Sequence, residues 1–148
     1  MSLPTQLRHA MIMLLLGPLC TPHAKAGEQR IECPELAPNA VQITNVPLGW
    51  TARVPSPLRL VSAGVMFGPP ARMAVSKPDA SSTRGGKTVV KWIGLDGAMP
   101  GGKWMSCWYG ADQDVVFSRP IAENTTECAV THSKDAQKRL MLDISCRS

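Results

Sequence analysis

The sequence is poor in phenylalanine and tyrosine, with two and one respectively among 148 residues, so its large apolar side chains are mostly aliphatic or tryptophan. It also lacks any apolar run of roughly 20 residues, the length that a membrane-spanning helix needs. Lysine and arginine form no block or stripe, which argues against a nucleic-acid partner. The sequence therefore predicts neither a membrane-spanning protein nor a nucleic-acid-binding one.

Closely spaced metal ligands are also missing. Beyond residue 26 the chain has one histidine, His132, and four cysteines that lie at least 18 positions apart, namely Cys33, Cys107, Cys128 and Cys146. Zinc ligands normally come in pairs two to four residues apart, so the spacing predicts no metal and no cofactor. An even number of cysteines in a short exported chain predicts two disulfides instead.

Residues 1–26 have the form of a secretory signal. Arg8 and His9 precede the apolar run "AMIMLLLGPL", and the small-residue site Ala24-Lys25-Ala26 follows it, so cleavage is expected after Ala26. A lipoprotein signal ending at Cys20 is disfavoured because the preceding residue is leucine. The expected product is one mature β-rich domain, residues 27–148, in the periplasm or outside the cell, with no membrane anchor.

The mature chain of 122 residues suits one domain with a modest core. Its formal charge is +3, from 14 basic and 11 acidic residues, because the signal carries two of the basic residues and no acidic one. Four cysteines allow three pairings. We favour Cys107 with Cys128, which closes a short loop, and Cys33 with Cys146, which joins the mature termini.

Short β-type runs separated by Gly, Pro and Asn recur along the mature chain, and no window shows a convincing helical period. The pattern predicts an all-β fold, a single antiparallel sandwich or small barrel with a C-terminal meander. Residues 77–86 are expected to form a surface loop. The predicted strands are Val41–Val46, Thr51–Val54, Leu58–Ser62, Val65–Phe67, Arg72–Ser76, Lys87–Leu95, Lys103–Tyr109, Asp114–Arg119, Glu127–His132 and Arg139–Cys146.

The predicted strand "KWMSCWY" carries large side chains on both faces. Its period of two places Met105, Cys107 and Tyr109 on one face and Trp104, Ser106 and Trp108 on the other. The strand is therefore expected to be covered on both sides, or else to present its tryptophans to a ligand.

Trp92 lies on the preceding predicted strand, which a short loop joins to the tryptophan strand. The two strands are expected to be hairpin neighbours, with Trp92 near Trp104 or Trp108. Tryptophan commonly anchors protein partners or stacks on sugars. We take Trp92, Trp104, Ser106 and Trp108 as the candidate ligand-binding residues, against the alternative that the tryptophans only fill a core short of Phe and Tyr.

Catalytic chemistry finds little support. Cys107 could act as a nucleophile only with His132 as its base, and a half-cystine beside an unrelated histidine is the simpler interpretation. The carboxylates Asp112, Asp114 and Glu127 could serve an enzyme acting on envelope glycan or peptide, but turn and solvent roles are the favoured interpretation. We predict that the protein is not an enzyme.

Several segments together carry a family resemblance: "ECP", "NVPLGW", "SPLRL", "GGKTVVKW", "GKWMSCWYG", "TECAVTHSKD" and the closing "LDISC". The chain resembles a family of small uncharacterised exported proteins of Gram-negative bacteria, some of them encoded near type VI secretion clusters. The resemblance implies a periplasmic address and suits an immunity or accessory protein. It transfers no catalytic residue.

A looser likeness is to periplasmic lysozyme inhibitors, small β-barrels with a cysteine-bearing strand of similar outline to "WMSCWYGADQDVVF". The sequence thus predicts an exported binding or inhibitory protein, such as an immunity protein or hydrolase inhibitor, whose partner is a secreted toxin or a cell-wall hydrolase. An envelope-acting enzyme and a purely structural envelope protein are the alternatives.

Overall fold

The computed structural model describes residues 27–37, 43–54 and 57–148, so the predicted signal and part of the predicted strand Val41–Val46 lie outside the described residues. The described chain is all-β, with two antiparallel sheets and one short 3₁₀ turn, Pro70–Arg72. The strands are β1 Glu28–Ile31, β2 Leu60–Phe67, β3 Ala80–Arg84, β4 Lys87–Ile93, β5 Lys103–Tyr109, β6 Val115–Pro120, β7 Glu127–Lys134 and β8 Leu140–Arg147. The predicted fold class is confirmed.

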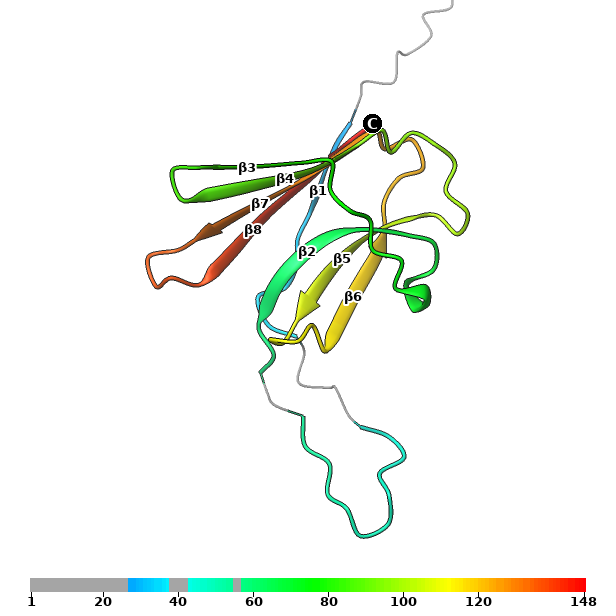
Figure 1. The fold of residues 1–148 in the computed structure, drawn as a ribbon, viewed down its shortest axis with the longest axis vertical. Coiled ribbons are helices and arrows are strands. Elements are labelled where there is room, and N and C mark those ends of the chain that lie inside the picture. The colour runs from blue at the N-terminus through cyan, green and yellow to red at the C-terminus, as the bar shows by residue number, and fades with distance from the viewer. Residues whose placement is uncertain (1–26, 38–42, 55–56) are drawn as a thin grey trace, which may run out of the picture.

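The larger sheet has the strand order β1-β8-β7-β4-β3, and the smaller sheet has the order β2-β5-β6. The two sheets approach each other near the C-terminal end and splay apart toward their hairpin turns (Figure 1). The tryptophan strands β4 and β5 therefore lie in different sheets, and the prediction that they are hairpin neighbours is wrong. The connection between them crosses from one sheet to the other.

The core lies between the sheets. Val65 and Met105 from the smaller sheet pack in one buried cluster with Val130 and Ile144 from the larger one. Alternation explains this, because the inward residues of each strand are apolar at every second position. A second cluster around Tyr109 fills the end of the sandwich next to residues 33–37.

The predicted strands from residue 87 onward are confirmed, and Lys103–Tyr109 matches β5 at both ends. The predicted strands Leu58–Ser62 and Val65–Phe67 are one strand, β2. The segment 77–86, expected as a loop, contains β3 because its polar residues form a hairpin with β4, and Arg84 pairs with Lys87 across a turn of two glycines. Residues 51–54 are not a strand, and β1 was not predicted.

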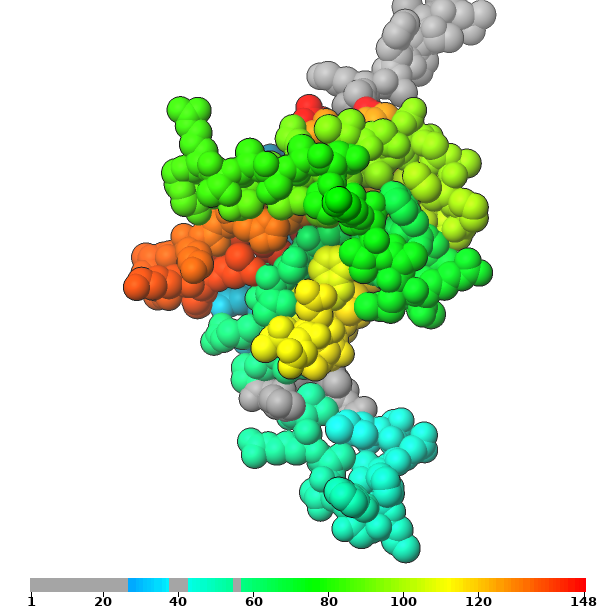
Figure 2. Space-filling view, viewed as in Figure 1, coloured from blue at the N-terminus to red at the C-terminus, as the bar shows by residue number. Residues whose placement is uncertain are grey.

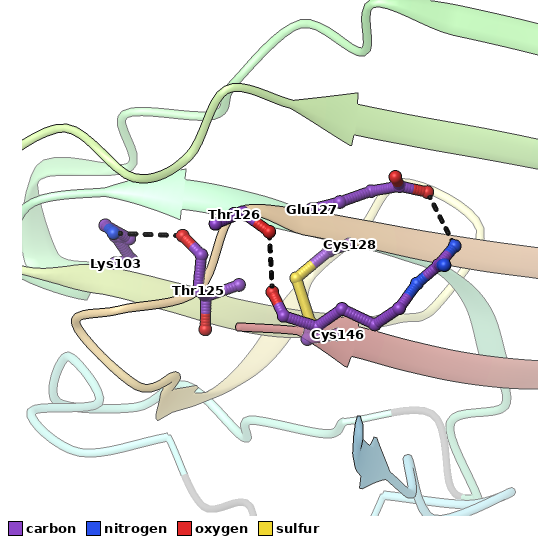
Figure 3. Close-up of a disulfide and its surroundings, with 7 residues drawn as sticks. Lys103, Thr125, Thr126, Glu127, Cys128 and Cys146 are labelled. Atoms are coloured by element: carbon purple, nitrogen blue, oxygen red, sulfur yellow. Dashed lines mark hydrogen bonds and ion pairs between the residues drawn. A yellow bond between two sulfur atoms is a disulfide. The ribbon is translucent and has the colours of Figure 1, made fainter. Parts of the chain in front are cut away.

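The favoured disulfide pairing is wrong. Cys33 bonds to Cys107, with 5.8 Å between their Cα atoms, and Cys128 bonds to Cys146, with 4.1 Å. The physical reason is strand register: Cys128 and Cys146 are direct partners in the antiparallel pair of β7 and β8 (Figure 3). All four cysteines of the described residues are therefore paired, as their even number predicted.

Candidate functional site

The strand β5 is covered on both sides, as expected. Met105, Cys107 and Tyr109 face the two core clusters. On the opposite face Ser106 is fully buried and its Oγ lies 2.7 Å from both Met66 Sδ and Ser118 Oγ. The hydroxyl is thus engaged within the smaller sheet.

Trp104 and Trp108 differ in their surroundings. Trp104 is half-buried, and its Nε1 donates a hydrogen bond to the Gly101 carbonyl at 3.0 Å. Trp108 is 4% exposed and lines a cleft at the outer edge of β2, beside the point where Ser76 pairs with Val65. Of the four predicted binding residues, Trp92 and Trp108 line this cleft, and Trp104 and Ser106 do not.

The cleft has a volume of about 240 Å³ and draws its walls from both sheets and from the connection between β2 and β3. That volume accommodates one large side chain or one sugar ring and is smaller than most drug-sized ligand pockets. The lining residues are Ser62, Ala63, Gly64, Val75, Ser76, Pro78, Val90, Trp92, Trp108, Gln113 and His132. Trp92, although carried by the other sheet, does lie near Trp108 as predicted, since both rings reach Gly64.

Polar atoms in the cleft walls are unequally satisfied. Trp92 Nε1 donates to the Ser76 carbonyl at 3.0 Å, which fixes that ring. Trp108 Nε1 and His132 Nδ1 are buried and have no hydrogen-bond partner among the described residues. Because a buried polar atom without a partner costs roughly 1–3 kcal/mol, each would gain from a hydrogen-bonding group that reached it.

A second feature is a projecting segment, residues 43–54, which we call the arm. Apart from Val54, which packs against the second core cluster, it projects from the end where β2 begins (Figure 1), and Figure 2 shows its surface protruding from the body. Leu48 is fully exposed and Trp50 is 76% exposed, and Ile43 and Val46 are also exposed. The segment "NVPLGW" contributes to the family resemblance, but its apolar residues resemble those of a core and give no local sign of exposure.

The chain segments before and after the arm are hydrogen-bonded to each other. The Ala37 amide donates to the Leu58 carbonyl and the Leu60 amide donates to the Glu35 carbonyl, both at 2.9 Å. The Cys33–Cys107 disulfide joins the same segment to β5. Residues 33–37 and the start of β2 therefore form a fixed base.

Charged side chains surround this base. Glu35 accepts from Arg59 at 3.1 Å and from Arg139 at 3.3 Å, and Arg139 also pairs with Asp135 at 2.7 Å. Desolvation raises the pKa of Asp135, but the backbone and side-chain hydrogen bonds from Arg139, its charge and the Gln137 amide together hold that pKa below its usual range. Lys138 adds another exposed cation.

The carboxylates considered for catalysis are not gathered in the cleft. Asp112 and Asp114 lie exposed in the turn between β5 and β6. Glu127 begins β7 in the other sheet and pairs with Lys91 and Arg147, each at 3.2 Å. Cys107 is consumed in a disulfide, and no group of three potential metal ligands occurs in the described ranges.

The family comparison is decisive. Residues 55–147 match the model of the type VI secretion system Tli immunity proteins, a stretch that contains β2 to β8. The chain belongs to the Tli immunity protein family. Membership supports an immunity or inhibitor role in the periplasm and implies an effector toxin of a type VI secretion system as the partner.

Other comparisons add nothing to this assignment. Neither curated proteins nor solved structures gave a match to the chain. Within the described segments, no helix has the length and apolar character needed to cross a membrane. The family match begins after the arm, so residues 43–54 and Cys33 lie outside the matched stretch.

Proposed function

We propose that this Tli family member is exported to the periplasm, where it binds one type VI effector toxin and blocks the toxin by direct contact. The family match carries the proposal, because it spans both sheets of the sandwich. The proposal requires no catalytic turnover by the protein. Inhibition results from the formation of an inactive complex with the toxin.

Export is the first part of the proposal. Residues 1–26 supply the secretory signal, and residues 27–148 fold as one domain after its removal. The two disulfides support an oxidising compartment, since bonds of this kind rarely persist in a reducing cytosol. The toxin is then one that acts in the periplasm, such as a cell-wall hydrolase.

The cleft is the second part. An apolar or aromatic group of the toxin would contact Trp92 and Trp108, while a polar group beside it would accept from Trp108 Nε1. A small pocket lined by tryptophan is the kind of site in which a few residues supply most of the binding energy. Trp104 and Ser106 act here by holding β5 in place.

A protection experiment tests the function. Sensitive cells expressing the full chain are exposed to attacker cells whose type VI system delivers one effector at a time. We expect survival against one effector, and a one-to-one complex between that purified effector and the protein recovered from the periplasm. A chain whose signal 1–26 has been deleted is the matched control and should not protect.

Two results would reverse the proposal. Protection against no effector would remove the immunity role. Turnover of peptidoglycan by the purified protein alone would favour the envelope-enzyme alternative, and Asp114→Asn and Glu127→Gln would then identify which carboxylate is responsible.

A further inference from the structure

The arm exposes its apolar side chains to an extent that the body does not. Trp50 is 76% exposed, whereas Trp92 and Trp108 are 4% exposed each, and Leu48 beside it is fully exposed. Single exposed apolar residues are common, but a tryptophan and a leucine two positions apart at the tip of a projection place two large apolar surfaces in solvent. Such surfaces mark sites of protein association.

The tip is held in one conformation by its own backbone. The Trp50 amide donates to the Pro47 carbonyl at 3.0 Å, and Gly49 has φ +82°, as the third residue of a type II turn requires. Glycine at the third position adopts this positive φ without steric cost. Leu48 and Trp50 are therefore presented as a preformed pair, which lowers the conformational entropy lost on binding.

The charges around the arm select the chemistry of its partner. Residues 43–54 contain one charged residue, Arg53, and no acidic one. At the base Arg59 and Arg139 are paired with Glu35 and Asp135, Lys138 is exposed, and the adjoining β5–β6 turn adds the exposed Asp112 and Asp114. The base is therefore balanced in charge, and a complementary surface would be apolar at its centre with an acidic group opposite Arg53 at its rim.

The arm's position in the chain is also informative. The family match begins at residue 55, so the arm lies outside the stretch that matches other family members, yet the Cys33–Cys107 disulfide ties its base to the matched strand β5. The Gly110 amide donates to the Arg59 carbonyl at 3.0 Å, so the arm's base adjoins the β5–β6 turn that supplies Gln113 to the cleft. Arm and cleft border the same end of the sandwich.

We propose that the arm tip, residues 47–50, inserts into an apolar, acid-rimmed recess of the effector toxin and anchors that particular toxin to the protein. This inference rests on the proposed immunity function and names the contact that makes it specific. Leu48 and Trp50 fill the recess, and Arg53 faces its rim.

The test uses the double variant Leu48→Ser/Trp50→Ser in the full exported chain. Its matched control is Ile93→Ser, since Ile93 is 54% exposed at the end of β4 on the body. Binding to the purified effector against which the wild type protects is measured by calorimetry, and thermal unfolding is measured beside it. We expect at least about 30-fold weaker binding and lost protection in the arm variant, because buried anchors of this type commonly dominate an interface. The control should bind as the wild type does, and neither variant should change the melting temperature by more than a few degrees.

The fluorescence of Trp50 provides an independent measurement. Acrylamide should quench the Trp50 emission of the free protein, and the effector should protect that emission in the wild type. Trp50→Phe identifies the signal, because this variant should lack the quenchable part altogether. If the arm variant bound the toxin with the affinity of the wild type, the inference would be overturned and the immunity function would still stand. A wild type that protects against no effector would overturn both.

Other occupants give distinct results. Binding of the wild type to vesicles of phosphatidylglycerol and phosphatidylethanolamine, lost in the arm variant while the effector still binds, would assign the tip to a membrane surface. A concentration-dependent dimer that the arm variant cannot form would assign it to a second copy of this chain. Either outcome overturns the proposal.

Discussion

Trp92 and Trp108 come from different sheets and meet over one backbone position, Gly64. A Cβ atom at Gly64 would lie 3.1 Å from Trp92 Cζ2 and 3.2 Å from Trp108 Cζ3. Both rings are buried, and the hydrogen bond from Trp92 to Ser76 limits how far that ring can retreat. The absence of a side chain at Gly64 is therefore what allows the two indoles to border one cleft.

Gly64→Ala should destabilise the protein. Adding a methyl group against two buried rings is overpacking, so the free energy of unfolding should fall by about 1–3 kcal/mol. Gly97→Ala is the control, because a Cβ there meets nothing within 4 Å and its effect should stay within about 0.5 kcal/mol. Urea unfolding of both variants measures the difference. Equal effects would contradict the packing described here.

The two disulfides should contribute unequally. Cys33–Cys107 closes a separation of 74 residues and joins the N-terminal segment to the smaller sheet, whereas Cys128–Cys146 closes 18 residues between strands that already pair. Loop-closure entropy gives about 4 kcal/mol for the first and about 3 kcal/mol for the second. We expect Cys33→Ala/Cys107→Ala to lower the unfolding free energy more than Cys128→Ala/Cys146→Ala.

Non-reducing peptide mapping of the exported protein provides the direct check on this pairing. It should recover a Cys33–Cys107 peptide and a Cys128–Cys146 peptide. A Cys107–Cys128 peptide would contradict this pairing and support the one expected from the sequence. A larger loss of unfolding free energy in Cys128→Ala/Cys146→Ala than in Cys33→Ala/Cys107→Ala would contradict the ranking of the two bonds.

The disulfides also show what the sequence could and could not predict. Alternation in "KWMSCWY" correctly placed Cys107 toward the interior, because a strand's two faces follow from period two alone. Its partner depends on how residues 33–37 cross the end of the sandwich, a relation between segments 74 positions apart. Nothing local in the sequence encodes that crossing.

The candidate site divides in the same way. Trp92 and Trp108 were predicted to be close, but through a hairpin, whereas the structure brings them together between sheets because β4 pairs with β3 and β7. The arm was missed for another reason. Leu48 and Trp50 resemble ordinary core residues in sequence, and only their position on a projection makes them exposed.

Asp135 should make stability depend on pH below about 4. Its Oδ1 accepts from the amides of Gln137 and Arg139 and its Oδ2 accepts from Arg139 Nε at 2.7 Å. Desolvation raises its pKa, but these bonds and the charge of Arg139 outweigh it, so the folded pKa lies below the unfolded value of about 3.9. The stabilisation is present above that value and is lost as the pH falls through the folded pKa.

Asp135→Asn is the variant that tests this. Compared with the wild type, it should have a lower free energy of unfolding at pH 6. That free energy should also decline less steeply as the pH falls below about 4, as measured by urea unfolding at each pH. Asp143→Asn serves as the control, since Asp143 makes only a long, exposed pair with Arg30 at 3.4 Å. An unchanged pH slope in Asp135→Asn would show that the carboxylate contributes nothing.

Gly49→Ala should weaken toxin binding without destabilising the body. Alanine disfavours φ +82° by roughly 1–2 kcal/mol, so the turn at the arm tip would open more often. That difference corresponds to about 5- to 30-fold weaker binding. Gly49→Asn is the matched control, because asparagine tolerates this conformation better. Equal binding by the alanine variant and the wild type would show that the turn need not be preformed.

Arg53→Glu should slow association with the toxin. A charge reversal on an exposed rim changes the rate of encounter more than the lifetime of the complex, and salt screens the effect. We expect a several-fold lower association rate at about 50 mM salt, shrinking toward wild type at about 500 mM, with a nearly constant dissociation rate. Arg84→Glu, an equally exposed arginine at the end of β3 in the other sheet, is the control. If reversal at Arg84 slowed association as much as reversal at Arg53, the net charge of the protein, and not the arm, would be steering the encounter.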